Sequence, residues 1–212
     1  ICAVFTAGKK PTGSSDPLGV RRAALGIIKT VLEHNLKLDL SKLIDESISL
    51  LPIKADVKKD IEEFFVQRLI IFLNSGYSKN VLEACSENNP CKDLNDYVLR
   101  VNAVNTINDE KLLENANRVL RILKDTSCEE VKPELLAEHA EKDLYKAIET
   151  VKFEGDYKKY LTDLIQINPI VTKFFDDVLV MAEDEKMKNN RLALLNDLKN
   201  KYTMLTNFAK LG

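Results

Sequence analysis

The stretch DEKLLENANRVLRILKD, residues Asp109–Asp125, indicates the fold more clearly than any other part of the chain. At the turn of about 100° per residue of an α-helix, its apolar side chains fall on one stripe. The stripe consists of Leu112, Leu113, Ala116, Val119, Leu120 and Leu123. The opposite side carries Lys111, Asn117, Arg118, Arg121 and Lys124. This pattern predicts an amphipathic helix, capped by Asn108, that packs one face against a core and exposes the other.

The helical period continues through most of the chain. It predicts further helices over residues 17–34, 40–50, 56–74, 78–86, 93–104, 133–151 and 184–210. Another helix follows the turn FEGDY and is expected to end at about Asn168, before Pro169. Asp16 is the expected N-cap of the first long helix, with Pro17 at its first position. The segment FFVQRLIIFL, within 56–74, is apolar around most of its circumference and is predicted to be the central helix of a core.

These patterns favour an all-α helical bundle. A period-2 alternation typical of strands persists nowhere beyond the opening residues, and no internal repeat is found. The helix that ends at Ser75-Gly76 is followed by polar loops, which predicts two domains, 1–76 and 77–212. The first residue is Ile1, within the apolar segment ICAVFTAG, so we expect the chain to be a fragment of a longer protein.

Composition restricts the classes of function. The chain has 31 basic and 33 acidic residues, so any site for a polyanion must be a local basic patch. The four cysteines form no CxxC pair, and with two histidines they suggest reduced thiols rather than a zinc site. No apolar run approaches 18 residues, from which we expect no membrane partner and a cytoplasmic location.

Sequence motifs for catalysis are absent. The chain has no GxxxxGK(S/T), GxGxxG, HExxH or GxSxG motif. The segment GKKPTG at Gly8–Gly13 resembles a phosphate-binding loop only weakly. The acidic pair Asp176-Asp177 and the run Glu183–Glu185 are more typical of helix termini than of metal sites. We therefore predict no catalytic residue, no metal and no cofactor in this part of the protein.

Two arginines, Arg21 and Arg191, fall on the apolar stripes of their helices. A buried guanidinium is costly unless carboxylates or carbonyls surround it. Both are therefore predicted to be structural, each with a buried partner.

Three stretches resemble bacterial glycyl-tRNA synthetase beta subunits. GKKPTGSSDPLGVRRAALGIIK (Gly8–Lys29) is similar to the family's KPTGSxDPFxLRRAALG, and NRVLRIL (Asn117–Leu123) to its (K/R)RVxNIL helix. FFDDVLVMAEDEKMKNNRLALLNDL (Phe174–Leu198) matches FFDxVMVM followed by NRLxLL near the family's C-terminus. The three appear in the family's order and spacing, and the first and third are long and specific. Gly19 and Arg121 depart from its usual residues.

The resemblance implies an α2β2 heterotetramer that joins glycine to tRNA(Gly). ATP and Mg would be used in the alpha subunit, whereas the beta subunit would contribute tRNA recognition. Residues 1–76 would close an HD-like helical domain, whose metal histidines would precede Ile1, and 77–212 would form a DALR-type anticodon-binding domain. The last helix also resembles arginyl-tRNA synthetases, although the KPTG…RRAALG segment argues against that alternative.

Candidate tRNA-binding residues lie on the polar face of the 109–125 helix. Arg118 and Arg121 project together there. They are the main candidates, because arginine pairs bidentately with phosphates and stacks on bases. The candidates beside them are Lys111, Asn117 and Lys124, with Arg100 on the preceding helix. Lys9, Lys10 and Arg22 are expected to contact the tRNA backbone outside the anticodon domain, and Tyr97, Phe153 and Tyr157 are possible stacking platforms.

Two alternatives stay open for these residues. Glu114 and Asp125 share the polar face of the same helix, so its cations can instead form ordinary ion pairs with them. A helical protein-interaction module without RNA binding also fits the near-neutral charge. A continuous positive patch would favour tRNA, and an exposed apolar groove would favour a protein partner.

Overall fold

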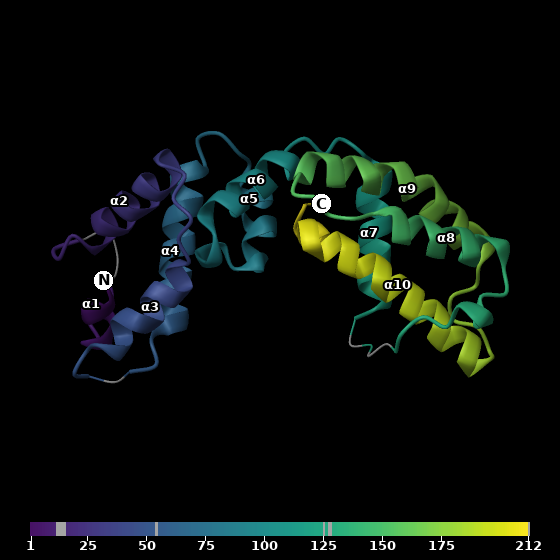
Figure 1. Cartoon of the computed structure of the whole chain (residues 1–212), viewed down its shortest axis with the longest axis horizontal. Coiled ribbons are helices and arrows are strands. Elements are labelled where there is room, and N and C mark those ends of the chain that lie inside the picture. The colour runs from purple at the N-terminus through teal and green to yellow at the C-terminus, as the bar shows by residue number, and fades with distance from the viewer. Residues whose placement is uncertain (12–15, 54, 125, 127–128, 212) are drawn as a thin grey trace. The chain divides into compact units, whose positions relative to one another are not determined.

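The computed structural model describes residues 1–11, 16–53, 55–124, 126 and 129–211. Helices and short 3-10 turns make up the regular structure of these residues, which contain no strand, and the prediction of an all-α fold is confirmed (Figure 1). The helices are α1 (Cys2–Thr6), α2 (Val20–Glu33), α3 (Leu40–Ser49), α4 (Lys58–Leu73), α5 (Lys79–Cys85), α6 (Leu94–Val104), α7 (Glu110–Ile122), α8 (His139–Thr150), α9 (Tyr157–Asp177) and α10 (Glu185–Leu205). The 3-10 turns are η1 (Ser86–Asn88), η2 (Pro90–Lys92), η3 (Pro133–Leu135) and η4 (Phe208–Lys210).

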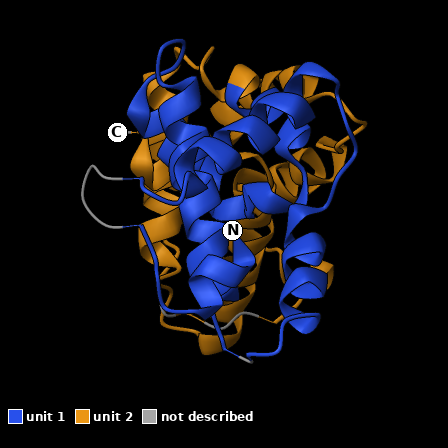
Figure 2. Ribbon diagram, turned by 90° about the vertical axis from the view of Figure 1, so that its left-hand side faces the viewer, with its two compact units in different colours: residues 1–101 blue, residues 102–212 orange. Residues whose placement is uncertain are grey.

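The chain divides into two compact units, Ile1–Val101 and Asn102–Gly212, which Figure 2 colours separately. The division falls within α6, whereas the sequence-based boundary at Gly76 follows the end of α4. The helix after Gly76, α5, packs on α4 and therefore belongs to the first unit. None of the described helices combines the length and apolar character needed to span a bilayer.

The first unit is built around α4. This helix packs against α2, α3, α5 and η2, as expected from its nearly uniform apolar surface. Ile61 and Leu69 of α4 are fully buried, and its Phe64 lies 5.3 Å, centroid to centroid, from Phe5 of α1. Burial of aromatic and branched side chains on several sides of one helix makes it the core element of the unit.

The start of α2 differs from the prediction. The helix begins at Val20 rather than at Pro17, because Gly19 adopts a left-handed conformation with φ 66° that ends the preceding turn. The Asp16 carboxylate still serves the helix terminus: its oxygens accept hydrogen bonds from the backbone N–H groups of Arg21 (3.2 Å) and Arg22 (3.3 Å). Asp16 thus satisfies donors that the helix itself leaves without partners.

The second unit is a bundle of α7, α8, α9 and α10, with α8 and α9 side by side (Figure 1). Two sequence predictions are wrong here. The N-cap of α7 is Asp109, not Asn108, and its side chain accepts a hydrogen bond from the N–H of Leu112 at 2.8 Å. Helix α9 does not stop before Pro169 but continues to Asp177. Pro169 is exposed, so its ring meets solvent, and packing on both sides of it outweighs the one lost backbone hydrogen bond.

Two glycines in the same region allow a test of the backbone at the start of α2. Gly19→Ala should lower the free energy of unfolding by about 1–2 kcal/mol, because a Cβ is disfavoured at positive φ. Gly26→Ala is the matched control: it lies within α2, and a Cβ there would meet no atom within 4 Å. That change should stabilise by about 0.5–1 kcal/mol. Urea unfolding of both variants measures the difference, and two changes of the same sign would contradict this description of Gly19.

Candidate nucleic-acid interface

Helix α7 presents its polar side to solvent because its other side is fixed in the bundle. Leu112, Asn115, Ala116 and Val119 are buried where α7 packs against α9, α10 and η4. The opposite side is termed the α7 basic face. It comprises Lys111, Arg118, Arg121 and Lys124, all exposed, and Asn117, which is half-buried.

Arg118 is held in place by an aromatic ring. Its guanidinium carbon lies over the ring of Phe175, 4.1 Å from the centroid. Phe175 belongs to the last turn of α9, is 7% exposed and packs edge-on against Phe174. Attraction between the cation and the ring face fixes the guanidinium while leaving the residue exposed.

The charges on the α7 basic face are not all neutralised by neighbouring acids. The Lys111 ammonium donates to Glu114 at 2.8 Å, and this hydrogen bond holds the pKa of the Glu114 carboxyl below its usual value. The positive charge of Arg118 acts in the same direction. Among the described residues, Arg121 and Lys124 form no ion pair. The ion-pair alternative therefore applies to Lys111, while Asp125 lies outside the described residues.

A buried polar contact that the sequence reasoning missed sets the position of α7 on α9. The Asn115 amide nitrogen donates to Asn168 Oδ1 at 2.8 Å and to Thr172 Oγ1 at 2.9 Å. Asn115 is 3% and Asn168 4% exposed. The sequence carried a signal for this contact: Asn115 lies on the apolar stripe beside Leu112 and Ala116, and a buried amide needs hydrogen-bond partners.

Arg100 does not lie with the other candidate tRNA-binding residues at the surface. Its residue is 8% exposed and its guanidinium pairs with Asp96 one turn earlier on α6. A guanidinium engaged in this way in the interior of the first unit is not presented to a ligand. The helical period of α6 in the sequence was too weak to show that Arg100 lies on the buried side of the helix.

The three basic candidates near the N-terminus also lie in the first unit. Lys10 pairs with Asp60, and Arg22 lies 3.7 Å from the carboxylate of Asp16. Lys9 is exposed. These side chains are solvent-accessible, but two of the three already have acidic partners.

Two of the three aromatic residues considered as stacking platforms are buried, and the third packs on one of them. Tyr97 is buried and donates its hydroxyl hydrogen bond to the carbonyl of Leu82 at 2.8 Å. Tyr157 is also buried, and the half-buried Phe153 packs on it with 4.5 Å between ring centroids. None of the three offers an open ring face comparable to the exposed guanidinium of Arg118.

Arg191 lies in the core of the second unit with a carboxylate partner. Its Nε donates to Glu141 Oε1 at 2.5 Å and its NH1 to the carbonyl of Leu179 at 2.9 Å. Glu141 is 1% exposed, and its second oxygen accepts the backbone N–H of Glu138, which caps α8. The other predicted structural arginine, Arg21, is half-buried rather than buried, because it lies at the edge of the packed side of α2.

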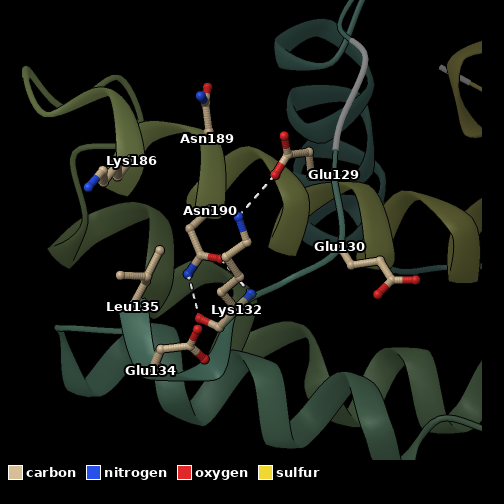
Figure 3. Close-up of a pocket in the computed structure, with 8 residues that line it drawn as sticks. All are labelled: Glu129, Glu130, Lys132, Glu134, Leu135, Lys186, Asn189 and Asn190. Carbon is tan, nitrogen blue, oxygen red and sulfur yellow. Dashed lines mark hydrogen bonds and ion pairs between the residues drawn. The ribbon is translucent and has the colours of Figure 1, made fainter.

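A pocket of about 410 Å³ lies between the segment before α8 and the start of α10 (Figure 3). Within it the Asn190 side chain accepts from the backbone N–H of Lys132 at 2.7 Å and donates to its carbonyl at 3.1 Å. The lining has three glutamates (Glu129, Glu130 and Glu134) against two lysines (Lys132 and Lys186), so its net negative charge is unsuited to a phosphate. The two Asn190–Lys132 hydrogen bonds hold the segment before α8 against α10, and the pocket does not add an anion site to the α7 basic face.

Metal ligands and thiols are two further kinds of functional group to consider. No group of three or more His, Cys, Asp or Glu side chains among them is arranged to hold a metal. Cys2, Cys85 and Cys91 are not joined in disulfides, and burial raises the pKa of Cys91 to about 12. A thiol with so high a pKa is unreactive at neutral pH. Cys128 lies outside the described residues.

Two family models match separate parts of the chain. Residues 1–87 match the family described as "Glycyl-tRNA synthetase beta subunit", and residues 110–205 match "DALR anticodon binding domain". The chain is 34% identical to the glycine–tRNA ligase beta subunit of Trichlorobacter lovleyi, over all of this chain and 33% of that relative. The beta subunit from Aquifex aeolicus is 37% identical over 98% of this chain and 31% of its own length. The chain thus spans about a third of the length of the curated relatives it matches.

The fold of the second unit and its family match define an all-α domain of the anticodon-binding class. The match over residues 1–87 lies outside that domain and distinguishes the glycyl from the arginyl alternative. The chain belongs to the glycyl-tRNA synthetase beta-subunit family.

Replacement of Arg191 tests the buried ion pair. Arg191→Met should lower the free energy of unfolding by about 3–5 kcal/mol, because Glu141 would remain buried without a cation. Adding Glu141→Gln removes the stranded charge and should restore part of that loss. Arg22→Met, at a side chain that is 79% exposed, should change stability by less than about 1 kcal/mol. Equal losses in the single and double variants would show that the loss does not come from a stranded Glu141 charge.

Proposed function

We propose that this chain binds tRNA through the α7 basic face, as part of a glycine–tRNA ligase. The observation that carries the proposal is the position of two exposed arginines, Arg118 and Arg121, on one side of a helix within the matched anticodon-binding domain. An anticodon loop presents unstacked bases and closely spaced phosphates. Arginine suits both, because its planar fork binds phosphate oxygens bidentately and also stacks on bases.

The second unit supports this proposal by its distribution of arginine. It contains three arginines, of which Arg191 is buried with Glu141. The other two are Arg118 and Arg121, both exposed on α7. The surface arginines of this unit are therefore concentrated on one helix face, while the chain as a whole carries a net charge of −2. A local patch of this kind can attract a polyanion in a nearly neutral protein.

The chemistry of the ligase is proposed to occur elsewhere. The relatives are named beta subunits, and we infer a separate alpha subunit that joins glycine to tRNA(Gly) with ATP and Mg, in an α2β2 assembly in the cytoplasm. In this proposal the present chain contributes no catalytic residue. Its role is to hold the tRNA so that the acceptor end reaches a site on the partner.

A second candidate function, contact with a protein partner, is favoured by an apolar pocket in the first unit. The pocket has a volume of about 520 Å³ and is lined mainly by aliphatic side chains, with Ile27 38% and Leu43 42% exposed. Exposed apolar surface of this kind is typical of interaction sites. The alpha subunit is the partner proposed here, and this contact is compatible with tRNA binding by the second unit.

Loss of both α7 arginines tests RNA binding. Arg118→Ala with Arg121→Ala should weaken binding of glycine tRNA at least about tenfold, and reduce the salt slope by about one unit for each phosphate contact removed. The control, Lys146→Ala with Lys158→Ala, removes two exposed charges of the same unit outside α7. Gel-shift titrations at several salt concentrations measure both effects. Unchanged affinity of the arginine variant at low salt would exclude the α7 basic face.

The protein contact is tested in the full-length beta subunit. Leu43→Lys should reduce its co-purification with the alpha subunit severalfold, because a charge in the apolar pocket cannot be desolvated cheaply. Met204→Lys, at a similarly exposed side chain of the second unit (38%), is the control. Sedimentation of the mixed subunits gives the assembled fraction. Equal assembly of both variants would remove the pocket from the interface.

A further inference from the structure

We propose that the outer side of the Arg118 guanidinium is a stacking platform for an unpaired nucleobase. This inference rests on the proposed tRNA binding and deepens it, because it assigns different roles to two neighbouring arginines. Arg118 would act through its flat shape, whereas Arg121 would act through its charge on an adjacent phosphate.

The first step is the orientation of Arg118. A guanidinium carbon only 4.1 Å from the centroid of Phe175 is typical of a guanidinium that lies flat against the ring. Phe175 is itself immobilised, because it is buried in the last turn of α9, which ends with a hydrogen bond from Val178 N–H to the Phe174 carbonyl at 2.9 Å. One side of the guanidinium is therefore covered by a fixed ring, while the residue stays exposed to solvent.

The second step concerns the charge of Arg118. Within the described part of the chain no carboxylate forms an ion pair with it, and Glu114, one turn earlier, is bound to Lys111 at 2.8 Å instead. A purely structural arginine at a surface would normally be fixed by an acid or by carbonyl groups. Within the described residues the contact that orients Arg118 is instead the Phe175 ring, which fixes the guanidinium plane and leaves its outer side uncovered.

The third step identifies the class of ligand. Unstacked bases of loops bind on guanidinium planes, and every base offers a π-face, so such a platform selects single-stranded over duplex nucleotides. Arg121 follows Arg118 by almost one helical turn on the same face, and within the described residues it has no acidic partner. One nucleotide can therefore place its base on Arg118 and its flanking phosphate at Arg121 at the same time.

Lysine substitution separates shape from charge, because lysine keeps the charge but has no plane to stack on. The probe is the anticodon stem-loop of glycine tRNA with 2-aminopurine at one loop position at a time, whose fluorescence is quenched on stacking. Wild-type chain should quench the signal at one loop position. Arg118→Lys should abolish that quench and weaken binding about tenfold with an unchanged salt slope. Arg121→Lys should retain the quench.

The platform itself is tested through Phe175. Phe175→Leu should reproduce the loss of quench, with folding checked by circular dichroism; if this variant does not fold, Arg118→Lys decides the question. Binding and quenching by Arg118→Lys equal to those of wild type would overturn the platform, while the loss of binding in the double alanine variant would still support the α7 basic face. Absence of any tRNA binding by the wild-type chain would overturn both.

Discussion

The ion pair between Arg191 and Glu141 lies where three segments of the second unit meet. Both side chains are almost completely removed from water, at 6% and 1% exposure, so their separation would leave a costly buried charge. Glu141 also accepts the N–H of Glu138 at the start of α8, and Arg191 donates to the carbonyl of Leu179 after α9. One buried contact therefore fixes α8, the end of α9 and α10 together.

This constraint reaches the candidate RNA-binding surface through α9. Leu179 lies only four residues after Phe175, so the carbonyl held by Arg191 limits where the last turn of α9 can lie. Asn115 fixes α7 on the same helix through Asn168 and Thr172. With both helices set by buried polar contacts, the ring of Phe175 comes to lie under Arg118. An exposed arginine thus owes its orientation to buried groups behind it, an arrangement that would pre-organise the proposed binding surface.

Helical periodicity predicted most of the fold, but only part of the α7 basic face and of the contacts that support it. It indicated the exposed side of α7, and Arg191 was expected to be buried with a partner because it interrupts an apolar stripe. The identity of that partner did not follow, since Glu141 is 50 positions away and periodicity describes one helix at a time. The continuation of α9 through Pro169 and the burial of Arg100 were missed for the same reason: both depend on packing between helices, which outweighs local preference.

Arg100, Arg118 and Arg191 show why the residue type alone does not define an RNA site. All three lie on helices, yet Arg100 and Arg191 are held by carboxylates in the interior, and Arg118 is held by the face of an aromatic ring at the surface. A carboxylate neutralises the guanidinium that it orients, whereas a ring orients it and leaves its charge and one face available. In a chain with balanced charge, this difference in the supporting group decides which cations can take part in binding. The proposed anion- and base-binding surface therefore needs no basic excess in the chain as a whole.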